Sequence, residues 1–311
     1  MTAPETARAA GMRTALVPFA LLVMLGVLWG LSFSLAKIST TAGVHPFGLT
    51  AWQCTGGALI VLAFGLGRRE LPPVTRRHLG YYLGCAVLGI AVPSPVWFFA
   101  APHLPAGIMS LLVATVPLMT YGFALCLAME RLRWYRVLGI ALGFCAMLLI
   151  LAPRASLPAP GMAGWVLFCM VAPLCYALSN IFMARFRPDG ASSLALAAGM
   201  LIAGIAMIVP LAWFTGTMHS LMPPWDAVDF AVAGQPAITG IAYILMFEVI
   251  RTSGPVFFSQ VGYLVTAGGV LWGIALFGET HSPWIWAALA LMFVGLGLLN
   301  LRQRAPSRPL G

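Results

Sequence analysis

Ten apolar stretches, each about 20 residues long, recur along this chain between short polar segments. A helix of that length spans the hydrocarbon core of a bilayer, where every backbone N–H and C=O must find its partner within the protein. The pattern therefore predicts an all-α, polytopic membrane protein with ten transmembrane helices. The predicted spans are residues 16–37, 47–67, 79–100, 104–127, 134–152, 162–184, 191–214, 230–250, 255–277 and 283–301.

The composition agrees with this class. Hydrophobic residues make up 61% of the chain and charged residues 8%, and the mean hydropathy is +0.95. A soluble domain of 311 residues needs far more charge to cover its surface. The composition therefore excludes a soluble globular protein.

Lys and Arg are distributed unevenly about the predicted spans. If the N-terminus is cytoplasmic and the chain alternates sides, only Lys37 and Arg154 among the 17 Lys and Arg residues lie on the far side. An excess of Lys and Arg in short loops marks the cytoplasmic side. The asymmetry predicts that both termini are cytoplasmic, and it explains the pI near 9.7 without a nucleic-acid partner.

The two halves of the chain share landmarks at similar spacing. The same distance along the chain separates Glu130 from Glu279 and Pro117 from Thr266. Five spans per half is an odd number, so the second half would insert with opposite topology, as in transporters whose substrate site lies between inverted repeats. The alternative is chance similarity among apolar helices. The predicted parts are a cytoplasmic tail at 1–15, a first five-helix repeat at 16–152, a periplasmic linker at 153–161, an inverted second five-helix repeat at 162–301 and a cytoplasmic tail at 302–311.

Polar and aromatic side chains inside the spans are candidates for a substrate cavity. Polar groups at membrane depth are costly and usually face a cavity or a partner helix. The alternatives are a serine bond to its own helix, an amide bond between helices and simple aromatic packing. The candidate lining residues are Trp29, Ser32, Phe33, Pro93, Pro95, Trp97, Tyr176, Asn180, Gln235, Tyr243, Gln260 and Tyr263.

The segment Pro93-Ser94-Pro95 predicts a break in the span at 79–100, because two prolines remove two backbone donors. Broken helices at membrane depth are tolerated where they line a cavity or are covered by protein. Gln235-Pro236 suggests a similar break in the second half. The alternative for each is a packing kink without a role in transport.

Two charged residues are candidates for a gate or a coupling site. Lys37, the single lysine of the chain, lies near the outer end of the first span. It could snorkel to the interface, or it could form a charged gate or contact a substrate carboxylate. Glu248 lies near the inner end of its span, where an ion pair with Arg251 is favoured over proton coupling.

Several motifs resemble those of a known family. Trp29-Gly30-Leu31-Ser32-Phe33 followed by Lys37 is similar to the WGxxFxxxK signature of the drug/metabolite transporter superfamily. Similar family segments are Ala114 to Pro117, Glu130-Arg131-Leu132 with Gly139, and Phe277-Gly278-Glu279. The chain departs from the family pattern at Thr266, where a proline is expected, and at Trp52-Gln53-Cys54, where many relatives carry an arginine.

The subgroup that the chain resembles is the EamA-type exporters, and within it the aromatic amino-acid exporters. This resemblance implies two inverted five-helix repeats, export of small metabolites and a place in the bacterial inner membrane. It also implies that the helices at 134–152 and 283–301 form a peripheral or dimer pair. Glycines spaced by four residues, such as Gly26 with Gly30 and Gly269 with Gly273, predict close packing of helices within the chain.

Together these observations predict an exporter of neutral aromatic or large hydrophobic amino acids that works by alternating access. The alternatives are export of another solute, such as a purine or a cation, and a non-transporting scaffold or sensor. The expected partners are a small-molecule substrate and the lipid bilayer, with a homodimer left open. We expect no cofactor, no metal site and no catalytic residue.

Overall fold

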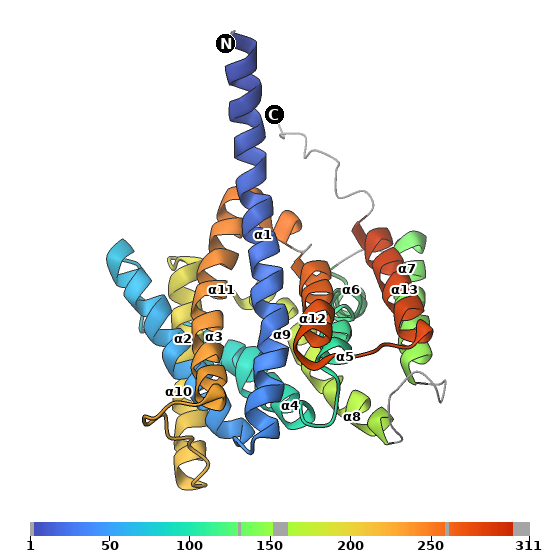
Figure 1. Ribbon diagram of the computed structural model, residues 1–311. Coiled ribbons are helices and arrows are strands. Elements are labelled where there is room, and N and C mark those ends of the chain that lie inside the picture. The colour runs from blue at the N-terminus through green and yellow to red at the C-terminus, as the bar shows by residue number, and fades with distance from the viewer. Residues whose placement is uncertain (1–2, 130–131, 152–160, 259–260, 301–311) are drawn as a thin grey trace.

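The computed structural model describes residues 3–129, 132–151, 161–258 and 261–300, and these residues form helices and connecting loops without a strand (Figure 1). Seven of the described helical segments are long and apolar enough to cross a membrane, and three shorter apolar helices accompany them. The predicted all-α membrane class is therefore confirmed for the described part of the chain.

The first half contains α1 (Ala3–Thr41), α2 (Pro46–Arg68), α3 (Arg76–Ala86), a π-helical turn η1 (Val87–Ala91), α4 (Pro93–Ala100), α5 (Ala106–Val113), α6 (Val116–Cys126) and α7 (Trp134–Leu151). The second half contains α8 (Met162–Cys169), α9 (Val171–Phe186), α10 (Ser193–Phe214), α11 (Ala227–Phe258), α12 (Val261–Phe277) and α13 (Pro283–Asn300). α1 begins at Ala3, inside the segment that the sequence predicted as a tail.

Three predicted spans are interrupted just before a proline. α3 gives way to η1, and α4 then starts at Pro93, which confirms the predicted break at Pro93-Ser94-Pro95. Pro117 follows the junction of α5 with α6, and Pro173 follows the junction of α8 with α9. Since proline donates no N–H and clashes with the preceding turn, the regular helix ends before it.

The predicted break at Gln235-Pro236 is wrong, because α11 runs through these residues without interruption. A single proline removes one helical donor, and the ring of Pro236 lies directly against Gly56 of α2, where a side chain would collide with it. The break in the second half lies instead between α8 and α9.

The backbones of α1 and α12 approach closely at glycines of both helices. A Cβ atom on Gly30 would lie 2.6 Å from the backbone nitrogen of Gly269 and 2.7 Å from the carbonyl carbon of Gly268. A Cβ on Gly26 would collide with Leu264 of α12. The glycine pairs therefore serve packing within the chain, as the sequence predicted.

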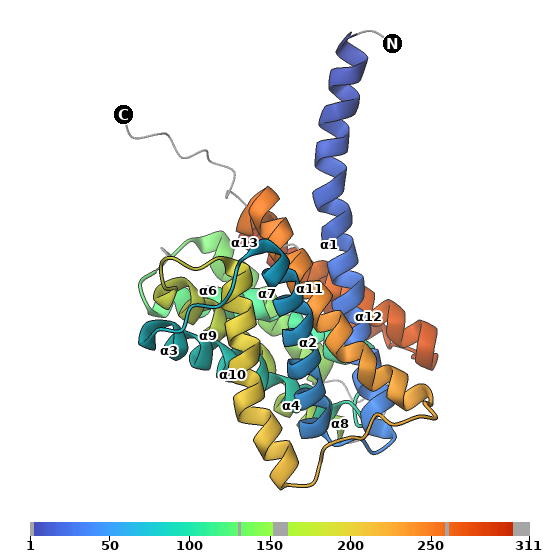
Figure 2. The ribbon, with the colours of Figure 1, turned by 90° about the vertical axis from the view of Figure 1, so that its left-hand side faces the viewer.

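The remaining helices surround this crossing. α11 packs against α1 on one side and α2 on the other, and α2 also contacts α10. Figure 2 shows α2, α10 and α11 side by side. α7 and α13 form a pair at the periphery of the bundle, where Gly295 lies against the carbonyl of Gly139 (Figure 1). α1 begins and α13 ends at the same end of the bundle (Figure 1).

Replacing Gly30 by alanine should destabilise the fold, because the new methyl group meets backbone atoms of α12 that cannot turn aside. We expect a loss of about 1–3 kcal/mol in the free energy of unfolding, measured by thermal unfolding of the purified protein in detergent. Gly80→Ala in α3 is the matched control, since its Cβ would meet nothing within 4 Å. Equal unfolding temperatures for the two variants would contradict the proposed crossing.

Candidate functional site

Three polar residues of α11 lie on one face at a spacing of four: Gln235, Thr239 and Tyr243. Gln235 is fully buried and bonds twice to α1. The Ser32 hydroxyl donates to Gln235 Oε1 over 2.7 Å, and Gln235 Nε2 donates to the Ser32 carbonyl over 2.8 Å. These two bonds tie α1 to α11 through neutral groups.

Thr239 continues this face toward α2. Gln53 Nε2 donates to the Thr239 hydroxyl over 3.2 Å, while Gln53 Oε1 is buried without a hydrogen-bond partner in the described part of the structure. A buried acceptor without a donor is unfavourable, so this carbonyl is available to a bound molecule with an N–H or O–H group.

Aromatic side chains flank the polar face. Phe33 of α1 meets Trp97 of α4 edge to face, with ring centroids 5.1 Å apart. Tyr176 of α9 packs in the same core as Trp97 and lies near Tyr243 of α11. The structure thus brings together six of the predicted residues from α1, α4, α9 and α11, and we call them the central cluster. Its members are Ser32, Phe33, Trp97, Tyr176, Gln235 and Tyr243.

Other predicted residues lie elsewhere. Trp29 packs between α1, α11 and α12. The ring of Tyr263 lies 5.3 Å from that of Phe293 on α13, and Asn180 is exposed and donates to the Thr120 hydroxyl over 3.3 Å. Pro93 and Pro95 are buried at the start of α4, whereas Gln260 lies outside the described residues.

Lys37 pairs with an acidic side chain. Its Nζ lies 3.2 Å from Glu279 Oε1, and the two side chains are 21% and 6% exposed. The ammonium also lies over the Phe277 ring, 4.9 Å from its centroid. The same carboxylate accepts the backbone N–H groups of Ala106 and Gly107, at 2.6 and 3.0 Å. One carboxylate thereby joins the ends of α1, α5 and α12, which closes this end of the bundle.

His281 completes this closed end. Its side chain is 1% exposed, and Nε2 lies 3.7 Å from Glu279 Oε2, which is beyond hydrogen-bond distance. Both ring nitrogens are buried without a hydrogen-bond partner in the described structure. Burial lowers the pKa of the imidazole, and the nearby Glu279 carboxylate partly offsets this effect.

Glu248 is half-buried in α11. The side chain of Arg251 lies outside the described part, so the pairing of these two residues stays a prediction.

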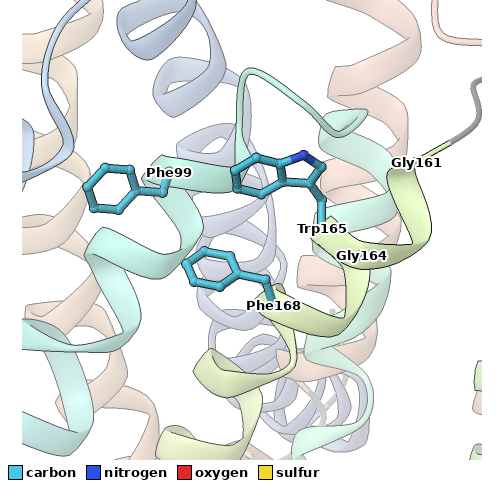
Figure 3. A pocket seen from close by; sticks show the side chains of 5 residues that line it. All are labelled: Phe99, Gly161, Gly164, Trp165 and Phe168. Atoms are coloured by element: carbon cyan, nitrogen blue, oxygen red, sulfur yellow. The ribbon is translucent and has the colours of Figure 1, made fainter.

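A separate pocket of about 620 Å³ lies between α4 and α8 (Figure 3). Its lining residues are Phe99, Gly161, Gly164, Trp165 and Phe168. Among them, the indole of Trp165 is the single polar side-chain group, and His103 stacks on that ring with centroids 3.9 Å apart. None of the predicted cavity residues lines this pocket, which offers apolar contact but little to orient a polar solute.

The sequence did not indicate Gln53, Thr239 or Glu279 as site residues. A signal existed for Thr239, which lies four residues from both Gln235 and Tyr243 on a helix. A signal also existed for Glu279, because the single lysine of the chain lies in an apolar span, where a counter-charge would stabilise it.

Polar groups buried between the two halves of a helical membrane bundle are typical of membrane transporters. The comparison with family models agrees: the EamA-like transporter family model matches residues 17–152 and again residues 163–301. The chain belongs to the EamA-like transporter family, as its motifs predicted.

The relatives of this chain include a protein named as an inner membrane transporter. The chain is 25% identical over 299 residues to the Escherichia coli K12 protein named "Uncharacterized inner membrane transporter YedA", with 94% of each chain covered. It is 27% identical over 216 residues to "Protein PecM" of Dickeya dadantii, with 69% of each covered. A solved crystal structure matches with a TM-score of 0.61 at 22% identity, over 94% of this chain and 99% of that chain, which shows the shared fold.

The buried His281 predicts a pH dependence of stability. Burial lowers the pKa of His281 in the folded protein from the ordinary 6.5. As the pH falls below 6.5, the unfolded chain therefore binds a proton at this residue before the folded protein does. Stability should therefore fall as the pH drops below 6.5, and His281→Asn should flatten this fall.

The measurement is the unfolding temperature of the detergent-solubilised protein between about pH 5 and pH 8. Parallel profiles for the wild type and His281→Asn would show that His281 does not cause the pH dependence.

Proposed function

We propose that the protein exports neutral aromatic or large hydrophobic amino acids across the bacterial inner membrane by alternating access. The observation that carries this proposal is the central cluster, where amide and hydroxyl groups are buried beside aromatic rings. In the described residues, every hydrogen bond of this cluster joins neutral groups. Such a surface suits a solute with an apolar ring and a few hydrogen-bonding groups.

The charge distribution supports a neutral or zwitterionic substrate. A sugar phosphate would call for Arg or Lys beside the polar face, and a cation would call for an acid there. Lys37 and Glu279 instead neutralise each other at one end of the bundle. The resemblance to aromatic amino-acid exporters points to the same class of solute.

The proposal includes ten spans in two inverted repeats. Its first support is that the family model matches twice, once in each half. Its second support is the packing pattern: α1 contacts α11 and α12, while its counterpart α9 contacts α4 and α6. Likewise α2 packs on α11 as α10 packs on α3. An inverted two-fold relation between the halves would produce these matched pairs.

Alternating access then requires the contacts of the closed end to open. With the N-terminus cytoplasmic, Lys37 and Glu279 lie at the outer end, so this structure corresponds to a state closed toward the outside. Lys37–Glu279 and Ser32–Gln235 both bridge the two halves of the chain, and these bonds must separate when substrate leaves.

Trp97→Ala should lower substrate counterflow about tenfold, the equivalent of about 1.4 kcal/mol lost from an aromatic contact with the solute. The assay loads proteoliposomes with unlabelled phenylalanine, tryptophan, threonine or methionine and follows uptake of the labelled amino acid without an ion gradient. Trp213→Ala is the control, because Trp213 is 71% exposed in α10 and should transport normally.

Equal counterflow by Trp97→Ala and wild type would place the substrate elsewhere. Absence of counterflow with every amino acid, from wild-type protein that unfolds cooperatively, would refute the proposed substrate class and call for a screen of purines and cations.

Reporter fusions test the proposed topology. Alkaline phosphatase fused after Gly216 should be active, whereas fusion after Asp189 should be inactive, because the Arg-rich segment around Arg185 and Arg187 stays cytoplasmic. A fluorescent protein at the C-terminus should be bright. The reverse activities would contradict the orientation, and activity at both loops would contradict the number of spans.

A further inference from the structure

Glu279 occupies a site that is built for a carboxylate. Its Oε1 accepts from Lys37 Nζ and the Ala106 N–H, and its Oε2 accepts from the Gly107 N–H. The two amides belong to the first turn of α5, where the helix dipole adds positive potential. Two adjacent N–H groups and an ammonium match the two oxygens of one carboxylate.

Glycines provide the room for this carboxylate. A Cβ atom on Gly273 would collide with Glu279 Oε2, and one on Gly107 would lie 3.2 Å from the same oxygen and 2.7 Å from His281 Nε2. Gly278, with φ of 61°, turns the chain after α12 so that Glu279 can reach back. The space for the Glu279 carboxylate is therefore set by the positions of glycine backbone atoms and does not depend on movable side chains.

His281 provides a polar group that Glu279 does not use. The imidazole is buried beside the carboxylate, and neither ring nitrogen has a hydrogen-bond partner among the described residues. An unpaired buried N–H is costly, and a carboxylate in a slightly different position could accept it. This points to a second ligand for the same space.

We propose that Lys37, the first amides of α5 and His281 form a carboxylate site for the exported substrate, and that Glu279 is an internal ligand holding it in the closed state. As the outer end opens, the substrate carboxylate replaces that of Glu279, so the bonds lost on opening are exchanged for equivalent bonds. The role as an exit site rests on the proposed function, whereas the binding of carboxylates to the site does not.

Glu279→Ala tests the site by leaving it without its internal ligand. The probe is sodium acetate, titrated against sodium chloride at equal ionic strength, and the readout is the unfolding temperature of the full-length protein in detergent. The variant should unfold at a lower temperature than wild type, and acetate should raise it saturably by at least about 2 °C. Wild type should not respond.

Two variants make the result specific. Asp189→Ala removes an exposed acid, 97% exposed as a side chain, and should show no response to acetate. Lys37→Met in the Glu279→Ala background should lose the response, because the ammonium is gone. A Glu279→Ala protein that ignores acetate, or an equal response in the Lys37→Met background, would overturn the proposal.

Counterflow tests the role in export. Phenylalanine should compete with labelled substrate much better than phenethylamine, which lacks the carboxylate, and Lys37→Gln should abolish that difference. Equal competition by the two compounds in the wild type would overturn the exit role even where acetate binds. Failure of all amino-acid counterflow, with acetate rescue intact, would reject the proposed function and keep the carboxylate site.

Discussion

The absence of water from the hydrocarbon core governs this structure, because every buried polar group must find its partner within the chain. Several polar side chains of the bundle meet that requirement across helix interfaces, and others donate to a carbonyl of their own helix. Ser32 and Gln235 exchange bonds between α1 and α11. Ser110 and Thr266 each donate a hydroxyl to the other's carbonyl between α5 and α12, at 3.2 Å. If α1 and α11 separate as proposed, Ser32 and Gln235 lose the bonds between them, and a substrate would have to satisfy the same groups.

Close backbone contact makes this polar arrangement possible. The glycines of α1 and α12 let the two helices cross with almost no side chain between them, and the same crossing brings Lys37 to Glu279 at one end of the bundle. Phe33, one helical turn before Lys37 along α1, packs against Trp97 deeper in the bundle. Neutral bonds and aromatic contacts lie within the bundle and the ion pair lies at its end, an order that keeps charge out of the hydrocarbon. The contacts that stabilise the fold are therefore the same contacts that the proposed export would break.

The sequence predicted an all-helical membrane protein because hydrophobic length is a strong local signal. It also predicted the break at Pro93, since two prolines in three residues remove two donors. It failed at Pro236, because Gly56 on another helix accommodates that ring, and such a contact cannot be read from local pattern. The same reason separates Gln235, which joins α1 to α11 in the central cluster, from Trp29 and Tyr263, which pack elsewhere. On a helix that is apolar all round, periodicity does not identify the inner face. The site around Glu279 joins segments far apart in the chain, so only the fold could assemble it.

Export by alternating access, as proposed, requires α1 and α11 to separate during each transport cycle. Leu35 and Gly234 bring these helices together beside the Ser32–Gln235 bonds, and a Cβ on Gly234 would lie 2.7 Å from Leu35 Cδ1. In the variant Leu35→Cys with Gly234→Cys, oxidation should form a disulfide between them. The most direct measurement is amino-acid counterflow by this double variant, oxidised and then reduced in the same proteoliposomes. The account predicts that counterflow is lost on cross-linking and returns on reduction. Unchanged counterflow by fully cross-linked protein would contradict it.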